Sequence, residues 1–337
     1  MYITLQQARD LADKVLETNG VSGENRAILS ELIVKAESEG SRSHGLMRLL
    51  DYVASIRAGW LNPSAYPIVR DAGDVFVTAD CQNGFTQVAA VLARDRLLEK
   101  SRRSGIAVLT VRNGHHIGAL WLDVEPFAIQ GMIALNFVNS RCRIAPYGSR
   151  NKLLGTNAMA FSTPDGRDGA VTWDQASSVM SLGDIKLYAC AGKPLPSGIG
   201  LDSVGNATND AVAVLNGGAL LPFGAHKGAS IAMMVEIMAA ALTGANFGFQ
   251  DDSPGFPGAA SSNAGQFILV INPQSFVGDT FAPRIAELFE HLRDNDAVRL
   301  PGDRRSEKRR LAMEEGLPLP DAEYKSLMDC IRRGTDA

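Results

Sequence analysis

The stretch Ile106-Ala107-Val108-Leu109-Thr110-Val111 is a short apolar run rich in β-branched residues, which is typical of a buried strand. Helical spacing of apolar residues predicts a helix before it, over residues 87–104, and another after it, over residues 121–130. The middle of the chain is therefore expected to form an α/β (mixed α+β) unit around a central sheet. Similar apolar runs predict further strands over residues 75–79, 132–138, 158–162, 170–173 and 267–271.

Both ends of the chain read as helices. At the N-terminal end, caps and spacing predict helices over residues 4–20, 22–40 and 43–58. At the other end, helical spacing covers residues 283–294, 306–315 and 322–332. We therefore expect two parts: a helical domain built from residues 1–70 and 286–337, and a central sheet domain over residues 71–285.

Composition excludes several classes of protein. With 337 residues, 45% of them hydrophobic, the chain can bury a sizeable core, and its net charge of -4 gives no reason to expect binding to nucleic acid or to a membrane surface. The four cysteines form no C-x-x-C pair, which favours a reducing, cytoplasmic compartment over a disulfide framework. The longest apolar helix candidate, residues 229–243, is interrupted by Glu236 and is too short to span a bilayer. The N-terminus lacks the features of a signal peptide.

The common nucleotide-binding loops are absent from the sequence. Neither G-x-G-x-x-G after a strand nor G-x-x-x-x-G-K-[ST] occurs. A bound nucleotide would therefore need a non-Rossmann scheme.

The first candidate cluster is Arg42-Ser43-His44-Gly45-Leu46-Met47-Arg48. On one helix His44 and Arg48 would share a face, so that Arg48 could hold a small carboxylate in its fork while His44 exchanges a proton near neutral pH. Alternatively, Ser43 caps an ordinary helix whose Arg48 is solvated.

The second cluster is His115-His116-Ile117-Gly118-Ala119-Leu120, which follows a predicted strand and precedes a predicted helix, at whose start backbone N–H groups favour phosphate. The adjacent histidines also suggest a metal ion, but no nearby carboxylate has ligand spacing. The ordinary alternative is a polar turn with one packed histidine.

Three later clusters could also face a ligand. Asp174-Gln175-Ala176 and Asp184 provide carboxylates after a strand, one of which could keep a histidine protonated, although both also suit ordinary loops. His226-Lys227 places cations at a helix N-terminus, which is unfavourable for the helix dipole and therefore indicates a phosphate ligand. Arg299-Leu300-Pro301-Gly302-Asp303-Arg304-Arg305 is a cationic turn that could grip phosphate or be simply solvated.

Taken in this order, these clusters resemble the type-2 malate/L-lactate dehydrogenase family of non-Rossmann nicotinamide oxidoreductases. The resemblance runs from about residue 3 to residue 330, and its most telling strings are Arg42-Ser43-His44-Gly45, Leu154-Gly155-Thr156-Asn157 and His226-Lys227-Gly228. The chain departs from the usual family pattern at Gln175 and Ser177, and at Ala225, where glycine is frequent.

Within that family the chain looks most like the branch that reduces 1-piperideine-2-carboxylate and 1-pyrroline-2-carboxylate. Members acting on malate, lactate or ureidoglycolate usually have Gly-Lys where this chain has Gly183-Asp184, and usually lack a histidine at the position of His226. They usually end the late turn with Pro-Gly-Glu, where this chain continues through Asp303 to Arg305.

The resemblance implies a mostly antiparallel central sheet, homodimers with active sites near the subunit interface, and a role for each matching residue. His44 would be the proton donor, with Ser43 and Asp184 as its relay partners. Arg48, Thr156, Leu182 and Gly183 would bind the substrate. The cofactor would contact His116, Ile117, Gly118, Ala119, Leu120, Asp174, Gln175, Ala176, His226, Lys227, Arg299, Leu300, Pro301, Gly302, Asp303, Arg304 and Arg305.

The expected cofactor is NADPH, with NADH as the alternative, because His226, Lys227, Arg304 and Arg305 offer positive charge for a 2′-phosphate. No metal is expected. The expected reaction is NADPH-dependent reduction of a small cyclic imine carboxylate to L-proline or L-pipecolate. The rival hypotheses are a 2-hydroxy-acid dehydrogenase of the malate, lactate or ureidoglycolate type, and a non-catalytic binding protein that retains the fold.

Overall fold

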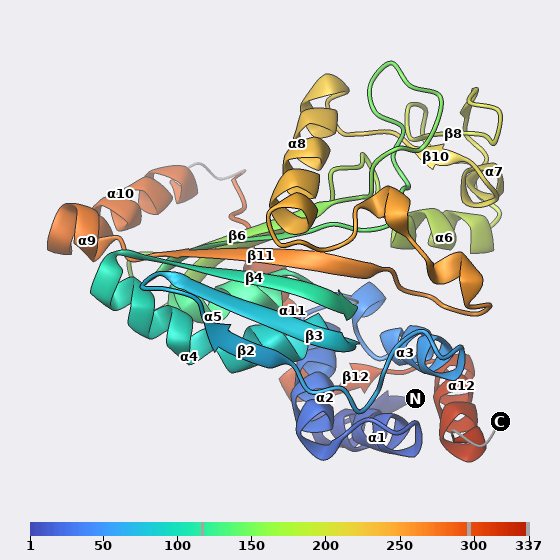
Figure 1. Ribbon diagram of the computed structural model, residues 1–337, viewed down its shortest axis with the longest axis horizontal. Helices are drawn as coiled ribbons and strands as arrows, with labels where there is room; N and C mark the ends of the chain where they lie inside the picture. Colours follow the sequence, from blue (N-terminus) through green and yellow to red (C-terminus); the bar gives the residue numbers. More distant parts are fainter. Residues whose placement is uncertain (116–117, 295–297, 335–337) are drawn as a thin grey trace.

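The computed structural model describes residues 1–115, 118–294 and 298–334, and its main body is a sheet with helices on both faces (Figure 1). The sheet is mostly antiparallel, as expected: β3 and β4 are its parallel pair, and α4 (Thr86–Ser104) is the crossover between them. In order across the sheet, the seven strands are β2 (Ile68–Asp71), β3 (Phe76–Phe85), β4 (Ile106–His115), β11 (Asn263–Ile271), β5 (Ile133–Val138), β6 (Ala158–Pro164) and β7 (Ala170–Gln175).

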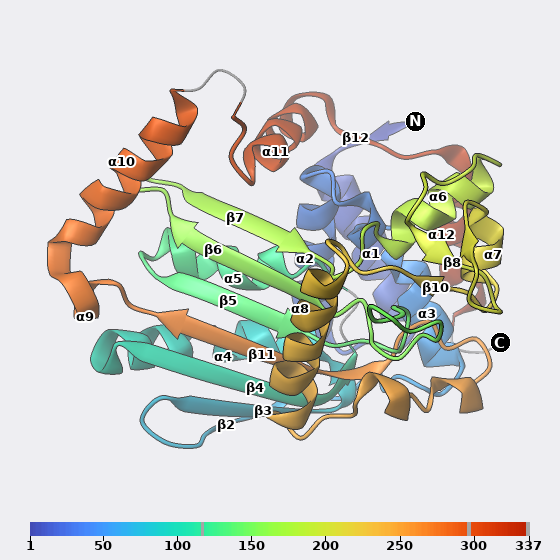
Figure 2. The same cartoon turned by 90° about the horizontal axis from the view of Figure 1, so that it is seen from above.

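Alternation along the strands divides the core between the two faces of the sheet. Leu109 and Ile268 point to the face covered by α4 and α5 (Trp121–Ile129), whereas Val108 and Phe267 point to the opposite face. There α8 (His226–Glu236), followed by a π-helical turn at Ile237–Ala241, crosses the middle strands (Figure 2). Strand β4 around Leu109 is therefore covered on both faces of the sheet, which explains its continuous apolar pattern.

The two ends of the chain pack together, below the sheet in the view of Figure 1. The short strands β1 (Tyr2–Ile3) and β12 (Leu317–Pro318) pair with each other, and one apolar core joins the terminal helices. The division of the chain into a helical domain and a sheet domain stays a prediction. The helices are α1 (Leu5–Thr18), α2 (Gly23–Ser38), α3 (Arg48–Arg57), α11 (Asp303–Glu315) and α12 (Asp321–Arg333).

The remaining elements lie beyond the ends of the sheet. Helix α10 (Phe281–Arg293), preceded by α9 (Gln274–Val277), lies beyond the end of the sheet at which β7 begins (Figure 2), where Phe289 packs against Val171 and Leu300. The segment between α6 (Leu182–Cys190) and α8 contains α7 (Ala211–Leu215) and short strands, which pack with α6 around Ile185. The short strands are β8 (Gly200–Leu201), β9 (Ala207–Thr208) and β10 (Ala219–Leu220).

The prediction of one continuous helix over residues 43–58 is wrong. The chain forms a 3₁₀ turn at Arg42–His44, leaves helical geometry at Gly45, and begins α3 only at Arg48. The cause is Glu37 of α2, whose buried carboxylate accepts a hydrogen bond from the Leu46 N–H (2.9 Å). A Cβ atom on Gly45 would lie 2.0 Å from Glu37 Oε2, so this approach requires glycine.

Candidate active site

Two adjoining cavities lie where β6, β7, the 3₁₀ turn and the start of α6 meet. The first, of about 580 Å³, and the second, of about 530 Å³, share His44, Arg48 and Thr156 among their lining residues. We call the first the cofactor-side cavity and the second the substrate-side cavity, after the roles predicted from the sequence for the residues that line them. The cofactor-side cavity brings together, from the predicted site residues, Ser43, His44, Arg48, Ala119, Leu120, Thr156, Asp174, Gln175, Ala176, Leu182, Gly183, Pro301, Gly302 and Arg305.

The 3₁₀ turn presents His44 to both cavities. Ser43 Oγ lies 2.9 Å from His44 Nδ1, a hydrogen bond whose direction depends on the imidazole tautomer. The turn itself is tied to α2, because Arg42 Nε donates to Glu37 Oε1 (3.2 Å). Burial raises the pKa of Glu37, whereas the Leu46 N–H and Arg42 act in the opposite direction. The Ser43 hydroxyl thus contacts the imidazole from the same turn, and a buried carboxylate shapes that turn.

The start of α6 lies against this turn. A Cβ atom on Gly183 would be 3.4 Å from Ser43 Cβ, an ordinary van der Waals distance, so the start of α6 lies next to the Ser43 side chain. Asp184 follows Gly183, and its carboxylate accepts a hydrogen bond from Ser181 Oγ (2.8 Å). Asp184 does not line either cavity in the described part of the chain, so its relay role with His44 stays a prediction.

Arg48 lies at the junction of the cavities. Its Nε donates to the Ser43 carbonyl, and its Nη1 pairs with Asp51 at the first turn of α3. Asp51 itself lines the substrate-side cavity. An incoming carboxylate would therefore compete with Asp51 for the guanidinium, or share it.

Thr156 is fixed by the neighbouring strand end. The backbone N–H of Thr156 donates a hydrogen bond to Ser140 Oγ (3.1 Å), and the Ser140 and Thr156 hydroxyl oxygens are 3.2 Å apart. Asn157 has a positive φ of 38° and donates to Glu236 Oε2 (2.6 Å). Gly155 must be glycine, because a Cβ atom there would lie 2.2 Å from the Ser140 carbonyl oxygen. The string Leu154-Gly155-Thr156-Asn157 is therefore a closely packed segment before β6 that positions one hydroxyl.

The start of α5 differs from the expected phosphate site. The Asp174 carboxylate accepts hydrogen bonds from the N–H groups of Leu120 (2.7 Å) and Trp121 (3.2 Å), so an internal anion takes the place foreseen for phosphate. His116 and Ile117 lie outside the described residues, and Gly118 lines the substrate-side cavity.

His115 is the packed histidine of the ordinary alternative. It is fully buried, with Nδ1 2.8 Å from Ser261 Oγ and Nε2 2.9 Å from Asn83 Oδ1. Burial lowers the pKa of His115 to about 4. It therefore stays neutral near pH 7 and joins strand β4 to the segments around Asn83 and Ser261.

The late cationic turn has mixed roles. Arg305 lines the cofactor-side cavity but is paired with Glu125 (2.7 Å) and Glu39 (3.3 Å), and its guanidinium lies 4.1 Å from the Trp121 ring centroid. Asp303 accepts a hydrogen bond from the N–H of Leu300 (3.0 Å), which is buried. In the described chain, the predicted cofactor residues that do not line either cavity are His226, Lys227, Arg299, Leu300, Asp303 and Arg304.

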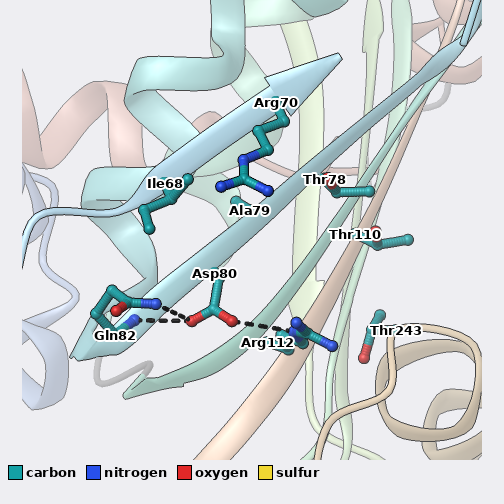
Figure 3. Close-up of a pocket in the computed structure, with 9 residues that line it drawn as sticks. All are labelled: Ile68, Arg70, Thr78, Ala79, Asp80, Gln82, Thr110, Arg112 and Thr243. Atoms are coloured by element: carbon teal, nitrogen blue, oxygen red, sulfur yellow. Dashed lines mark hydrogen bonds and ion pairs between the residues drawn. The ribbon is translucent and has the colours of Figure 1, made fainter. Parts of the chain in front are cut away.

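A further cavity of about 430 Å³ lies on the exposed face of β2, β3 and β4 (Figure 3). The Asp80 carboxylate accepts hydrogen bonds there from Gln82 and Arg112, and Arg70 lines the same cavity. The cavity contains none of the predicted site residues. Within the described ranges, no group of three or more His, Cys, Asp or Glu side chains could hold a metal ion, and no helix is long and apolar enough to cross a membrane.

Sequence reasoning missed several residues of the substrate-side cavity. Arg141 and Arg143 line it from the segment after β5, and Lys186 lines it from α6. The short spacing of the two arginines after a predicted strand was the available signal. Glu236 was noted in the sequence only as an interruption of an apolar helix. In the structure its carboxylate accepts a hydrogen bond from Asn157 and so holds the segment that contains Thr156.

Comparisons with known proteins place this geometry in a wider group. The family model described as malate/L-lactate dehydrogenase matches residues 3–328. A Δ1-pyrroline-2-carboxylate/Δ1-piperideine-2-carboxylate reductase of Pseudomonas putida is 41% identical over 98% of this chain and 96% of its own length. A (2R)-3-sulfolactate dehydrogenase (NADP+) of Chromohalobacter salexigens is 35% identical over 95% of each chain.

A solved structure shows the same likeness in three dimensions. The crystal structure of Δ1-piperideine-2-carboxylate reductase from Pseudomonas syringae pv. tomato superposes with a TM-score of 0.95 at 41% identity, and covers 98% of this chain and 99% of its own. A putative malate/lactate dehydrogenase from E. coli superposes with a TM-score of 0.91 at 26% identity, covering 99% of this chain and 95% of its own.

Proposed function

The chain belongs to the malate/L-lactate dehydrogenase family, and from this premise we propose that it is an NADPH-dependent reductase of cyclic imine carboxylates. It is an oxidoreductase, as its relatives and structural neighbours are. The proposed substrates are 1-pyrroline-2-carboxylate and 1-piperideine-2-carboxylate, and the products are L-proline and L-pipecolate. The observation that carries the proposal is the meeting of His44, Arg48 and Thr156 at the junction of two cavities.

The residues present fit a nicotinamide cofactor on one side of that junction. Trp121, Trp173 and the segment 174–176 line the cofactor-side cavity, which suits a flat ring with a polar rim. When bound, the cofactor would supply a hydride from C4 of its nicotinamide ring. Segment 174–176 and Arg305 would hold it in this cavity, next to His44.

The protein side of the reaction is proton control and orientation. A protonated imine accepts hydride far better than a neutral one, so His44 would keep or deliver the proton on the ring nitrogen. Ser43 fixes the imidazole at Nδ1, and Asp184 would favour its charged form. Arg48 and Thr156 would hold the carboxylate and so determine which face of the ring meets the cofactor.

Arg48→Lys is expected to raise KM for the imine roughly 10-fold, because an ammonium group cannot reproduce the bidentate fork of a guanidinium. Steady-state kinetics with varied imine measures the change, and kcat should fall less than KM rises. Arg9→Lys, an exposed position on α1, is the matched control. An unchanged KM in Arg48→Lys would remove Arg48 from carboxylate binding.

NADPH is expected to give a higher kcat/KM than NADH. Arg305 is committed to Glu39 and Glu125, so the proposal assigns the 2′-phosphate to His226, Lys227 and Arg304. Lys227→Met should therefore weaken the preference by lowering kcat/KM for NADPH while leaving that for NADH nearly unchanged. A preference of the unchanged protein for NADH would refute this assignment.

The activity itself is tested with a panel of substrates. Oxidation of NADPH is followed with 1-pyrroline-2-carboxylate, 1-piperideine-2-carboxylate, pyruvate and oxaloacetate. Turnover of the cyclic imines above that of the 2-oxo acids supports the proposal. The reverse order would favour a 2-hydroxy-acid dehydrogenase, and failure to bind either nicotinamide cofactor would favour a non-catalytic binding protein.

Two further features belong to the same proposal. Family membership supports a homodimer, which light scattering in solution would test. The four cysteines are free, in keeping with a reducing, cytoplasmic compartment.

A further inference from the structure

Arg143 is a half-buried cation in the substrate-side cavity with no assigned role. Its backbone is fixed on both sides: the N–H donates to the Leu154 carbonyl (2.7 Å), and the carbonyl accepts from the Leu220 N–H (2.8 Å). Its guanidinium makes no hydrogen bond or ion pair with any residue in the described ranges. The backbone is therefore held while the charged group stays available to the cavity.

The other cations of this cavity are differently placed. Arg48 pairs with Asp51, and Arg141 donates to the Ala260 carbonyl (2.7 Å). Lys186 is exposed to solvent, which screens its charge. Asp51 is the acidic side chain among the described lining residues, so positive charge exceeds negative charge around the substrate-side cavity.

The surroundings of Arg143 favour an anion. Burial lowers the pKa of Arg143, and Arg141 acts in the same direction, whereas Asp251 opposes them. A desolvated cation without a close counter-charge is unfavourable, and a bound carboxylate would remove that cost. No other anion-binding side chain matches the two oxygens of a carboxylate as well as the planar guanidinium group of arginine does.

We propose that Arg143 binds a second acidic group of the substrate, so that the preferred cyclic imine carries another carboxylate besides the one next to its C=N bond. This rests on the proposed function, in which Arg48 and Thr156 hold the first carboxylate. The cavity of about 530 Å³ leaves room for such a substituent on a five- or six-membered ring. Arg143 is then a specificity-determining residue, and the hydride and proton transfers do not require it.

The experiment compares 1-piperideine-2-carboxylate with 1-piperideine-2,6-dicarboxylate. For the unchanged protein, kcat/KM is expected to be higher for the dicarboxylate. Arg143→Met should lower kcat/KM for the dicarboxylate about 30-fold or more, because it removes one partner of a half-buried charge pair. The same variant should change kcat/KM for the monocarboxylate little, and Arg143→Lys should restore part of the dicarboxylate activity.

Lys152→Met is the matched control, since it removes an exposed cation from the same region of the chain without touching the cavity. It should leave the ratio of the two kcat/KM values unchanged. Equal losses on both substrates in Arg143→Met would overturn the proposal, because Arg143 would then hold the carboxylate that both share. Unchanged activity on both would overturn it as well.

Failure of the proposed function has a different signature. If the unchanged protein reduces neither imine, the reductase proposal fails, and binding decides the role of Arg143. Calorimetry with pyridine-2-carboxylate and pyridine-2,6-dicarboxylate, in the presence of NADP+, provides that readout. Tighter binding of the dicarboxylate that Arg143→Met abolishes supports the second anion site, and equal binding of the two acids refutes it.

Discussion

Replacing His44 by alanine is expected to lower kcat about 10²–10⁴-fold, the usual contribution of a positioned general acid. The 3₁₀ turn places His44 at the junction of the two cavities, with Ser43 Oγ 2.9 Å from Nδ1. The variant loses the group proposed to protonate the imine. Rapid-mixing measurements of imine reduction with saturating NADPH would separate this chemical step from product release.

Cofactor binding provides the control for His44→Ala. The Kd for NADPH, measured by fluorescence titration, should stay close to that of the unchanged protein, because the proposed phosphate contacts are elsewhere. Ser43→Ala should give a smaller loss of kcat, since the imidazole remains but loses its hydroxyl partner. Near-normal turnover of His44→Ala would exclude His44 as the proton donor.

Replacing Glu236 by alanine is expected to lower the free energy of unfolding by about 3–6 kcal/mol, because several buried donors would lose their acceptor. Glu236 is buried, and its carboxylate accepts hydrogen bonds from Gly248 N–H (2.6 Å), Asn157 Nδ2 (2.6 Å) and Asn139 Nδ2 (3.2 Å). Denaturant unfolding followed by circular dichroism measures the change. KM for the imine should also rise, because Asn157 adjoins Thr156.

Met233→Ala is the matched control for the Glu236 prediction. Met233 is 55% exposed on the same helix, α8, so its truncation should change the free energy of unfolding by less than about 0.5 kcal/mol. Glu236→Gln keeps the volume and one acceptor oxygen, and should give an intermediate loss. If Glu236→Ala unfolds at the same denaturant midpoint as the unchanged chain, the buried carboxylate of Glu236 does not stabilise the folded protein.

Local patterns predicted the framework well. The run from Ile106 to Val111 is a central strand, and the helices expected on either side of it occur as α4 and α5. The resemblance led to a mostly antiparallel sheet, which the strand pairing confirms. The strands and helices depend on hydrophobic periodicity within a short window, which is visible in the sequence, whereas the pairing of the strands was expected only from the resemblance.

The sequence by itself determined most of the strands and helices and which chemical groups are available, because propensity and periodicity act locally. The tertiary structure alone decided where those groups meet. Glu37 interrupts the helix expected over residues 43–58, the Asp174 carboxylate fills the start of α5, and Arg143 is left facing a cavity with its charge unpaired by the described residues. Each of these outcomes depends on which side chains and backbone groups of other segments come close in the folded chain, and sequence spacing does not encode that proximity.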